Sequence, residues 1–255
     1  MKGVIFMTNL NDEARALEVR LLRASSPEVQ ARIKAASAIH ILKAFSRGIF
    51  NQNNMMEIKF AENFLEKKPI QIVGFWGAGD KKSPDKADYL LLDEYRIIRD
   101  VIASVTQSSV EIILLMADIH GKFNGYNGFE GYHSSIDIEA KRRGFNPLPL
   151  GRLYEEWGIR LPDSGTPINE GLWKKFSDLR QSDQLIESAK KHNRQDVPVE
   201  RAAFDYWLMR NNEAQPLYNS FPRAVLFVNG SRDMAMVTLP KNMPHIYSRF
   251  GPVWF

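Results

Sequence analysis

Two adjacent lysines follow an apolar segment of the chain and could bind an anion or react with a carbonyl group. Lys81 and Lys82 lie in the loop GAGDKKSPD, shortly after Ile70–Phe75. A lysine in such a loop can hold a phosphate or carboxylate, or form an imine with a carbonyl substrate. The structural alternative is a pair of solvated surface lysines. Trp76, between the apolar segment and the loop, is a further candidate for substrate binding.

A carboxylate and an imidazole follow a second apolar segment and could take part in proton transfer. Ile112–Ala117 ends at Asp118, and His120 and Asn124 follow in the same polar stretch. Asp118 could orient a substrate amine or act as a base, and its structural alternative is to cap a neighbouring backbone turn. Asp118 and His120 could also contribute metal ligands. No third ligand has a suitable spacing, so the sequence favours a site without metal.

Arg210 and Glu213 are candidates on a later segment with helical periodicity. Three residues apart, they share one face of that helix, where an exposed ion pair would contribute only about 0.2–0.5 kcal/mol. If the pair is buried, Arg210 could instead hold an anion with two hydrogen bonds. His133 and His245 are weaker candidates, because such histidines more often make ordinary polar contacts.

A strand–helix–strand unit would bring the first two groups to one edge of a sheet. Both apolar segments are short and continuous, as in buried strands. Apolar residues between them recur at steps of three and four, as on one face of a helix: Leu91, Tyr95, Ile98, Ile102 and Val105. Two buried strands joined by one helix are parallel, and ligands bind beyond the carboxyl ends of such strands. We therefore expect an α/β fold with a Rossmann-like parallel-sheet core, and the site at this edge.

The remaining patterns add helices and a strand hairpin to this core. Helices are expected at 11–24, from Ser26 to about Gly48, around Phe60–Leu65, and at 134–143, 148–158, 172–192 and 198–217. Gly121–Gly131 is predicted as a loop, either a cover for a ligand or an ordinary surface loop. Asn229-Gly230 predicts a hairpin of Ala224–Val228 with Met234–Leu239. We expect one domain over 1–255, with 1–67 as a helical N-terminal layer and 68–255 as the sheet core with helical insertions.

Composition limits the class of protein. The 255 residues carry a net charge of only +4, which gives no reason to expect nucleic acid as a partner. Cysteine is absent, so disulfides and thiolate chemistry are excluded. The apolar run near the start of the sequence is too short for a secretory signal, and no later apolar run is long enough to span a membrane. We therefore expect a cytoplasmic protein without a membrane partner. No P-loop or dinucleotide fingerprint occurs, so no cofactor is expected. A homo-oligomer is left open.

Several short motifs occur in an order that a known family shares. Lys82-Ser83-Pro84-Asp85 follows the first predicted strand, and the second strand ends at Asp118. Met209–Ala214 precedes Phe221-Pro222, and Gly251–Trp254 lies directly before the last residue, Phe255. This order resembles the isonitrile (isocyanide) synthase family, also called the pyoverdine/dityrosine biosynthesis or PvcA-like family. The resemblance covers roughly residues 55–125 and 200–255, and it rests on the order of the motifs, since each alone is short.

The resemblance implies a Rossmann-like fold and an enzyme of specialised metabolism. Synthases of this family convert the α-amino group of an amino acid to an isonitrile, with the extra carbon from ribulose 5-phosphate. Carried over by position, Lys82 would engage the sugar phosphate or its carbonyl, Asp118 would hold or deprotonate the amine, and Arg210 would bind an anionic group. The implied partners are thus small molecules, an amino acid and a sugar phosphate.

The sequence also departs from the family pattern. Members often carry R-L-S-x-H in the late strand and end in Trp-His, where this chain has Leu226–Gly230 and Trp254-Phe255. Either His120 and Arg232 replace the missing His and Arg, or the chemistry has changed. Three readings stay open: an isonitrile-synthase-like enzyme, a divergent enzyme that modifies or condenses an amino acid in another way, and a non-catalytic small-molecule-binding protein.

Overall fold

A six-stranded sheet forms the centre of the protein in this computed structural model. The structure describes residues 15–24, 26–49, 53–163, 165–192, 194–228 and 240–248. The strands are β1 (Ser46–Ile49), β2 (Ile70–Trp76), β3 (Val110–Met116), β4 (Asn146–Pro149), β5 (Val225–Val228) and β6 (His245–Ser248). Their spatial order is β1-β6-β5-β2-β3-β4. All neighbouring pairs are parallel except β1 with β6. The predicted α/β fold with a parallel-sheet core is therefore confirmed.

The predicted strand–helix–strand unit is present. β2 pairs in parallel with β3, and Ile72 lies opposite Ile112. The crossover helix α4 (Lys86–Thr106) begins at Asp85, whose carboxylate accepts hydrogen bonds from backbone N–H groups of the first turn. Asp88 completes a capping box with Asp85. The residues that predicted this helix are buried in the core beside the sheet: Leu91, Tyr95, Ile98, Ile102 and Val105.

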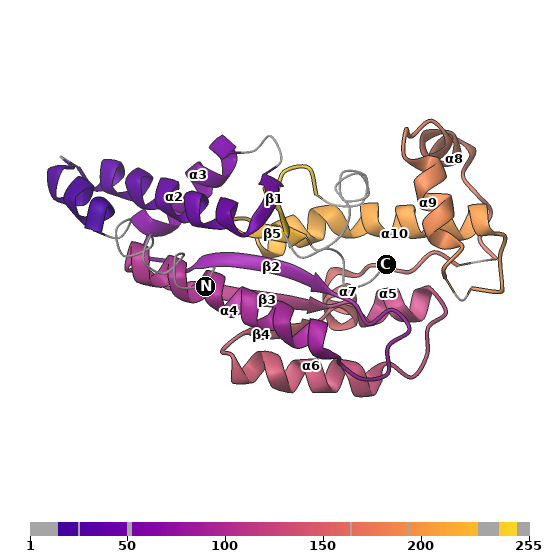
Figure 1. Cartoon of the computed structure of the whole chain (residues 1–255). Helices are drawn as coiled ribbons and strands as arrows, with labels where there is room; N and C mark the ends of the chain where they lie inside the picture. The colour runs from indigo at the N-terminus through magenta and orange to yellow at the C-terminus, as the bar shows by residue number, and fades with distance from the viewer. Residues whose placement is uncertain are drawn as a thin grey trace.

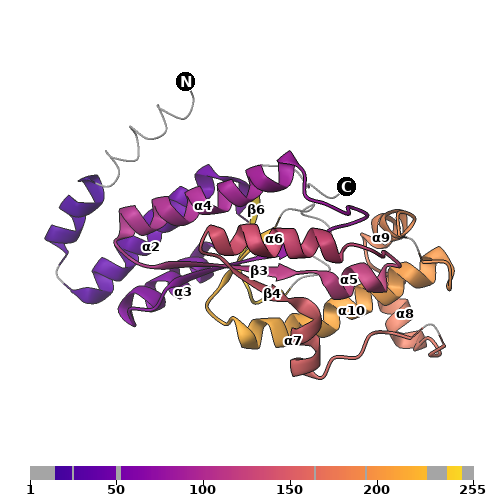
Figure 2. The same cartoon turned by 90° about the horizontal axis from the view of Figure 1, so that it is seen from below.

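Helices cover both faces of the sheet (Figures 1 and 2). Besides α4, the labelled helices are α2 (Pro27–Ala44), α3 (Asn53–Leu65), α5 (Asp118–Phe123), α6 (Glu130–Arg142), α7 (Leu150–Trp157), α8 (Glu170–Ser177), α9 (Ser182–Ala189) and α10 (Val199–Ser220). Residues 15–23, within the helix predicted at 11–24, are helical as well. α2, α3, α4 and α6 share a core with one face of β2 and β3. α7 and α10 share a second core with the opposite face. Among the described helices, none has the length and apolar character needed to cross a membrane.

The strand order places a switch point between β2 and β5. From β2 the chain moves through β3 to β4 on one side, and later through β5 to β6 on the other. At such a point the connections diverge and leave a crevice beyond the carboxyl ends of the strands. α10 runs back toward β5 from beyond that edge, and α8 and α9 pack on its first half (Figure 1). The fold thus sets α10 across the edge where we expected the site.

Two predicted elements differ from the structure, and packing explains both. α5 and the start of α6 reduce the predicted loop Gly121–Gly131 to 124–129. Gly121 lies within α5 and lets the Phe129 ring pack closely against that helix, because a Cβ at this position would lie 2.9 Å from the ring. The predicted helix 172–192 is two helices, α8 and α9, and the break lets Phe176 and Leu185 both join the cluster on α10.

Three short strands were not predicted. β1 lies within the segment expected to be helical, and β4 and β6 have only four residues each. The predicted partner of β5 in a hairpin, Met234–Leu239, lies outside the described residues. β5 itself pairs in parallel with β2 and β6.

Alanine at Gly74 should destabilise the protein. A Cβ at Gly74 would overlap the hydroxyl oxygen of Tyr95, so this buried ring or the backbone of β2 would have to shift. Such overpacking costs about 1–3 kcal/mol of unfolding free energy. Gly77→Ala is the matched control, because its nearest neighbour would be 4.0 Å away. Urea unfolding of the two variants tests this, and equal stabilities would contradict the close contact.

Candidate active site

A buried cluster of polar side chains lies at the carboxyl edge of the sheet. It joins His120 of α5, Tyr154 of α7, and Arg210 and Glu213 of α10, and each is at most 7% exposed. His120 Nε2 lies 2.8 Å from Glu213 Oε2, and the Tyr154 hydroxyl donates to the same oxygen at 2.6 Å. Arg210 Nη1 forms an ion pair with Glu213 Oε1. Three of the residues predicted from sequence, His120, Arg210 and Glu213, therefore meet at one place.

Aromatic rings hold this cluster in shape. The Arg210 guanidinium carbon lies 4.3 Å from the centre of the Phe75 ring, at the end of β2. Its Nη1 is 3.3 and 3.4 Å from the two ring nitrogens of His120, so it sits over the imidazole face. The Phe75 and His120 rings are stacked at 6.1 Å. Stacking on flat rings suits the planar guanidinium and fixes its orientation.

The local structure explains why these side chains converge. His120 lies in the first turns of α5, which follows β3 directly, so it stays close to the strand end. Arg210 and Glu213 lie three residues apart on α10 and share a face, as the sequence predicted. Tyr154 comes from α7, which packs against α10 on the same side of the sheet.

Burial sets the charges of the cluster. Burial lowers the pKa of His120, and the Arg210 cation lowers it further, while the Glu213 carboxylate acts to raise it. The net effect is a lowered pKa, so the imidazole is neutral at neutral pH. For Glu213, burial acts to raise the pKa, but Arg210 and His120 outweigh it and the carboxylate stays ionised. Because a carboxylate only accepts, His120 Nε2 carries the hydrogen and Nδ1 keeps its lone pair. A neutral imidazole oriented by a carboxylate can act as a base.

Asp118 contacts the start of α7. Its Oδ1 accepts a hydrogen bond from the Gly151 N–H at 2.9 Å, in the first turn of that helix. A Cβ at Gly151 would lie 2.8 Å from Asp118 Oδ2, so glycine permits this close approach. The contact matches the capping role that the sequence offered as the alternative to catalysis.

Asp118 variants separate a capping role from a catalytic one. Asp118→Ala should cost about 1 kcal/mol of unfolding free energy, the usual effect of losing a cap, and Asp118→Asn less because its amide oxygen can still accept. Chemical unfolding measures both. Full stability of Asp118→Ala would contradict the cap. A rate loss of about 100-fold in Asp118→Asn at unchanged stability would instead favour the base that the family resemblance implies.

Lys81 and Trp76 belong to a separate network at the start of α4. The Trp76 indole N–H donates to the Tyr132 hydroxyl at 2.9 Å, which donates to Asp88 Oδ1 at 3.0 Å. Lys81 pairs with Asp85 at 2.9 Å and with the buried Asp88 at 3.2 Å. These contacts join the loop after β2 to α4 and α6. They give both residues a structural role.

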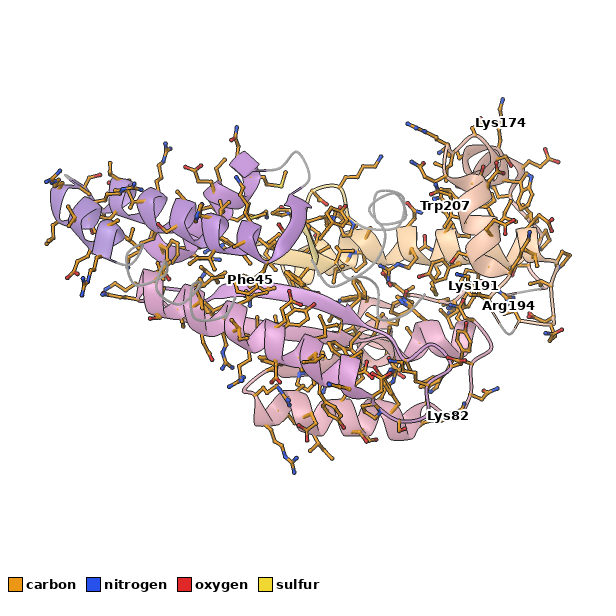
Figure 3. The ribbon with its side chains drawn as sticks, viewed as in Figure 1. Phe45, Lys82, Lys174, Lys191, Arg194 and Trp207 are labelled. Atoms are coloured by element: carbon orange, nitrogen blue, oxygen red, sulfur yellow. The ribbon has the colours of Figure 1, made fainter. Side chains whose placement is uncertain are left out.

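Lys82 contacts the loop 124–129. Its exposed ammonium donates to the backbone carbonyl of Asn127, and a Cβ at Gly128 would lie 3.2 Å from it. Tyr126 in the same loop donates to the Lys191 carbonyl at 2.7 Å. The loop is thus tied on both sides (Figure 3 labels Lys82 and Lys191). Arg232, the other predicted substrate-binding residue, lies outside the described residues.

Sequence reasoning missed Tyr154, Phe75 and Tyr206. Tyr206 precedes Arg210 by one turn of α10, and its ring lies 6.2 Å from that of His120. Aromatic residues at helical spacing more often belong to a hydrophobic core, so their residue type and spacing did not indicate a functional role. Within the described residues, no group of three His, Asp or Glu side chains is arranged to hold a metal ion.

Two histidines outside the cluster, the buried His245 and the half-buried His192, should make stability depend on pH. Burial lowers the pKa of His192 to about 4, and the nearby Arg194 cation also lowers it. Burial lowers the pKa of His245 to about 4 as well, although a hydrogen bond to the Pro240 backbone acts to raise it. Both values lie below the ordinary 6.5, so the unfolded chain binds more protons between pH 6.5 and 4. Stability should therefore fall as the pH falls through this window, by about 1.4 kcal/mol per pH unit for each histidine. Urea unfolding across the window measures this, and His192→Gln should flatten the slope. An unchanged slope in that variant would contradict the assignment.

Structural comparison relates the fold to that of a known protein. The chain matches the crystal structure of PvcA from Pseudomonas aeruginosa with a TM-score of 0.62 at 11% sequence identity, over 85% of this chain and 83% of PvcA. The chain has a PvcA-like fold. No protein-family model and no curated protein sequence matches it. At 11% identity the likeness to PvcA concerns the fold, and it agrees with the family that the order of the motifs resembles.

Proposed function

We propose that the protein is an enzyme that acts on the amino group of an amino acid, with isonitrile-synthase-like chemistry and ribulose 5-phosphate as carbon donor. The observation that carries the proposal is the neutral His120 held by the ionised Glu213 in the buried cluster. The PvcA-like fold and the order of the motifs support the choice of reaction. We also propose that the protein is cytoplasmic, consists of a single domain and acts on small molecules.

Energetics favour a functional reason for the cluster. Replacing a buried ion pair with apolar side chains is often neutral or stabilising, so burying Arg210 with Glu213 is a poor way to gain stability. Titratable groups with shifted pKa values at a strand edge are characteristic of active sites. The cluster lies at the edge where parallel α/β sheets bind ligands. These points together support catalysis or ligand binding.

The proposed first step is condensation of the amine with the ketone of the sugar phosphate. An amine is protonated at neutral pH and must lose a proton before its nitrogen can attack a carbonyl carbon. His120 Nδ1 takes that proton, and the Glu213 carboxylate stabilises the imidazolium that forms. As the new C–N bond forms, the carbonyl π bond breaks, and a proton passes from nitrogen to oxygen to give a carbinolamine. The imidazolium then returns its proton to the carbinolamine hydroxyl, which leaves as water, and the product is a protonated imine.

Arg210 and Tyr154 have supporting roles in this proposal. Arg210 binds an anionic group of the substrate, because a guanidinium suits a carboxylate. Burial and Glu213 raise the pKa of Tyr154, so the phenol stays protonated and keeps donating to Glu213. That hydrogen bond holds the carboxylate in place while His120 changes charge.

The second candidate is a divergent enzyme that modifies an amino acid without ribulose 5-phosphate. The position of Lys82 favours it. Lys82 is the residue implied to engage the sugar phosphate, yet it is exposed and donates to the backbone of the 124–129 loop. Under this candidate the His120–Glu213 pair would still act on the amine, and only the carbon donor would change.

A binding screen tests the substrate class. Thermal unfolding would be followed with each free amino acid, with ribulose 5-phosphate, and with both. A ligand at 100 times its dissociation constant should add about 2.7 kcal/mol of stability. We expect at least one amino acid to stabilise the protein, and more so with ribulose 5-phosphate. Absence of any shift with every amino acid would contradict the proposal.

A further inference from the structure

The candidate active site is closed to solvent. His120, Tyr154, Arg210 and Glu213 are each at most 7% exposed. A substrate has to come within about 3–3.5 Å of the group that reacts with it, so a wall of the site has to open before a substrate reaches His120. The wall that opens is expected to be a segment with few buried apolar contacts and few backbone hydrogen bonds.

Apolar packing holds most of the described walls in place. α7 and the second half of α10 share a core with the sheet. α8 and α9 pack on the first half of α10 in a separate apolar cluster. α5 follows β3 directly, and its Ile119 and Phe123 pack against the same core as α7. The loop 124–129 continues from α5 and is the described wall that remains.

The middle of this loop is weakly held. The N–H groups of Asn127 and Gly128 make no hydrogen bond with the backbone of another described residue, and both residues are exposed. Gly125 and Gly128, on either side of Tyr126 and Asn127, have φ angles of 76° and 71°. Glycine reaches both positive and negative φ at little cost, so the loop can change its path at these two positions.

Tyr126 joins the loop to the segment after α9. Its hydroxyl donates to the Lys191 carbonyl at 2.7 Å. A second contact joins the same two parts of the chain, because the Arg194 guanidinium lies 4.7 Å from the centre of the Phe123 ring (Figure 3 labels Lys191 and Arg194). Arg194 also forms an ion pair with the buried Asp205 of α10 at 3.4 Å. The segment after α9 is therefore anchored to α10, and the loop is the side that can move.

This junction lies beside His120. On the loop side, the Asn124 N–H donates to the His120 carbonyl at 3.0 Å. On the other side, His192 directly follows Lys191, and its ring lies 5.6 Å from the ring of Tyr206. The Tyr206 ring in turn lies 6.2 Å from that of His120. The two segments that Tyr126 joins thus flank the proposed base.

We propose that residues 125–128 form a gate to the candidate active site and that the Tyr126–Lys191 hydrogen bond is its latch. The inference rests on the proposed function, because it concerns access of the substrate to His120. Opening breaks this hydrogen bond and turns the chain at the two glycines, while α10 and the sheet stay in place. Lys82, which donates to the Asn127 carbonyl, is a second latch. Each hydrogen bond contributes little net free energy, so the gate opens often.

Chemical modification of histidines tests the gate without any substrate. Diethyl pyrocarbonate acylates neutral imidazole nitrogens, and His120 is neutral at pH 7 but buried. Its rate of modification, followed by mass spectrometry of peptides, reports how often the site opens. Tyr126→Phe removes only the latching hydroxyl, and we expect it to raise this rate about two- to tenfold, the effect of losing one net hydrogen bond. Lys82→Met should act in the same direction.

Other residues supply the controls. His40 is exposed on α2 and should react equally fast in wild type and variants. His245 is buried in β6, separated from β3 by β5 and β2, and its pKa of about 4 keeps it neutral as well. It reacts only when the fold itself loosens, so Tyr126→Phe should leave its rate unchanged. Tyr89→Phe removes a hydroxyl from the surface of α4 and should leave the His120 rate unchanged.

Equal rates of His120 modification in wild type and Tyr126→Phe would overturn the gate. A His120 that stays unmodified in every variant would overturn it too, and so would an acceleration shared by His245, which would indicate a looser fold. These results leave the proposed function standing, because the labelling uses no substrate. A faster rate at His120 alone, in a protein that converts no amino acid, supports the gate and contradicts the proposed function.

Discussion

Replacing Glu213 with alanine should destabilise the protein by about 3–5 kcal/mol. Glu213 is 1% exposed and accepts from His120 and Tyr154 while pairing with Arg210. The variant leaves the Arg210 cation buried without its partner and the Tyr154 hydroxyl without its acceptor. Urea unfolding at pH 7 measures the loss. This is the largest stability effect that we expect from one polar substitution.

Two comparisons make this result specific. Glu156→Ala removes an exposed ion pair with Arg152 on α7 and should change stability by less than about 0.5 kcal/mol. The double variant Arg210→Met/Glu213→Leu removes both charges and should recover most of the stability. Equal effects of Glu213→Ala and Glu156→Ala would show that the buried pair is not formed.

Replacing His120 with glutamine should lower the turnover rate by about 100- to 10,000-fold, the usual contribution of a general base. The glutamine amide can still donate to Glu213, so the cluster keeps its hydrogen bond and the fold should survive. What is lost is the lone pair on His120 Nδ1. The measurement is consumption of the amino acid that the binding screen identifies, with unfolding followed in parallel.

The acid side of the rate profile gives an independent check on His120. Its pKa is lowered, so wild-type activity should persist below pH 6.5 and fall only where the imidazole gains its proton. His133→Gln is the matched control, because His133 lies on α6 and contacts Phe129 rather than the cluster. Full turnover by a folded His120→Gln variant would remove His120 from the mechanism.

The core of the fold could be predicted because its signals are local. β2, α4 and β3 combine continuous apolar runs with a helical face and a capping aspartate. β4 could not be predicted, since its sequence NPLP contains two prolines. It lies at the edge of the sheet, where missing N–H groups are tolerated. β6 is held in the sheet by pairing with β1 and β5. A segment of only four residues does not show this pairing in its sequence pattern.

The candidate site could be predicted only in part. His120, Arg210 and Glu213 were recognised by residue type, but 93 positions separate His120 from Glu213, and only the sheet edge brings them together. Lys81 and Trp76 had equally suggestive types and belong to the network around Asp88. Tyr154 had no local signal, because its role depends on where α7 lies relative to α10.

Transfer of labelled carbon tests the central claim most directly. The protein would be incubated with the amino acid that it binds and with ribulose 5-phosphate labelled at every carbon, and products would be analysed by mass spectrometry. We predict a product in which the amino group has gained one labelled carbon and lost its two hydrogens. His120→Gln should form it far more slowly. A product without label would favour the divergent enzyme, and absence of any product, with the amino acid bound, would contradict catalysis on the amino group.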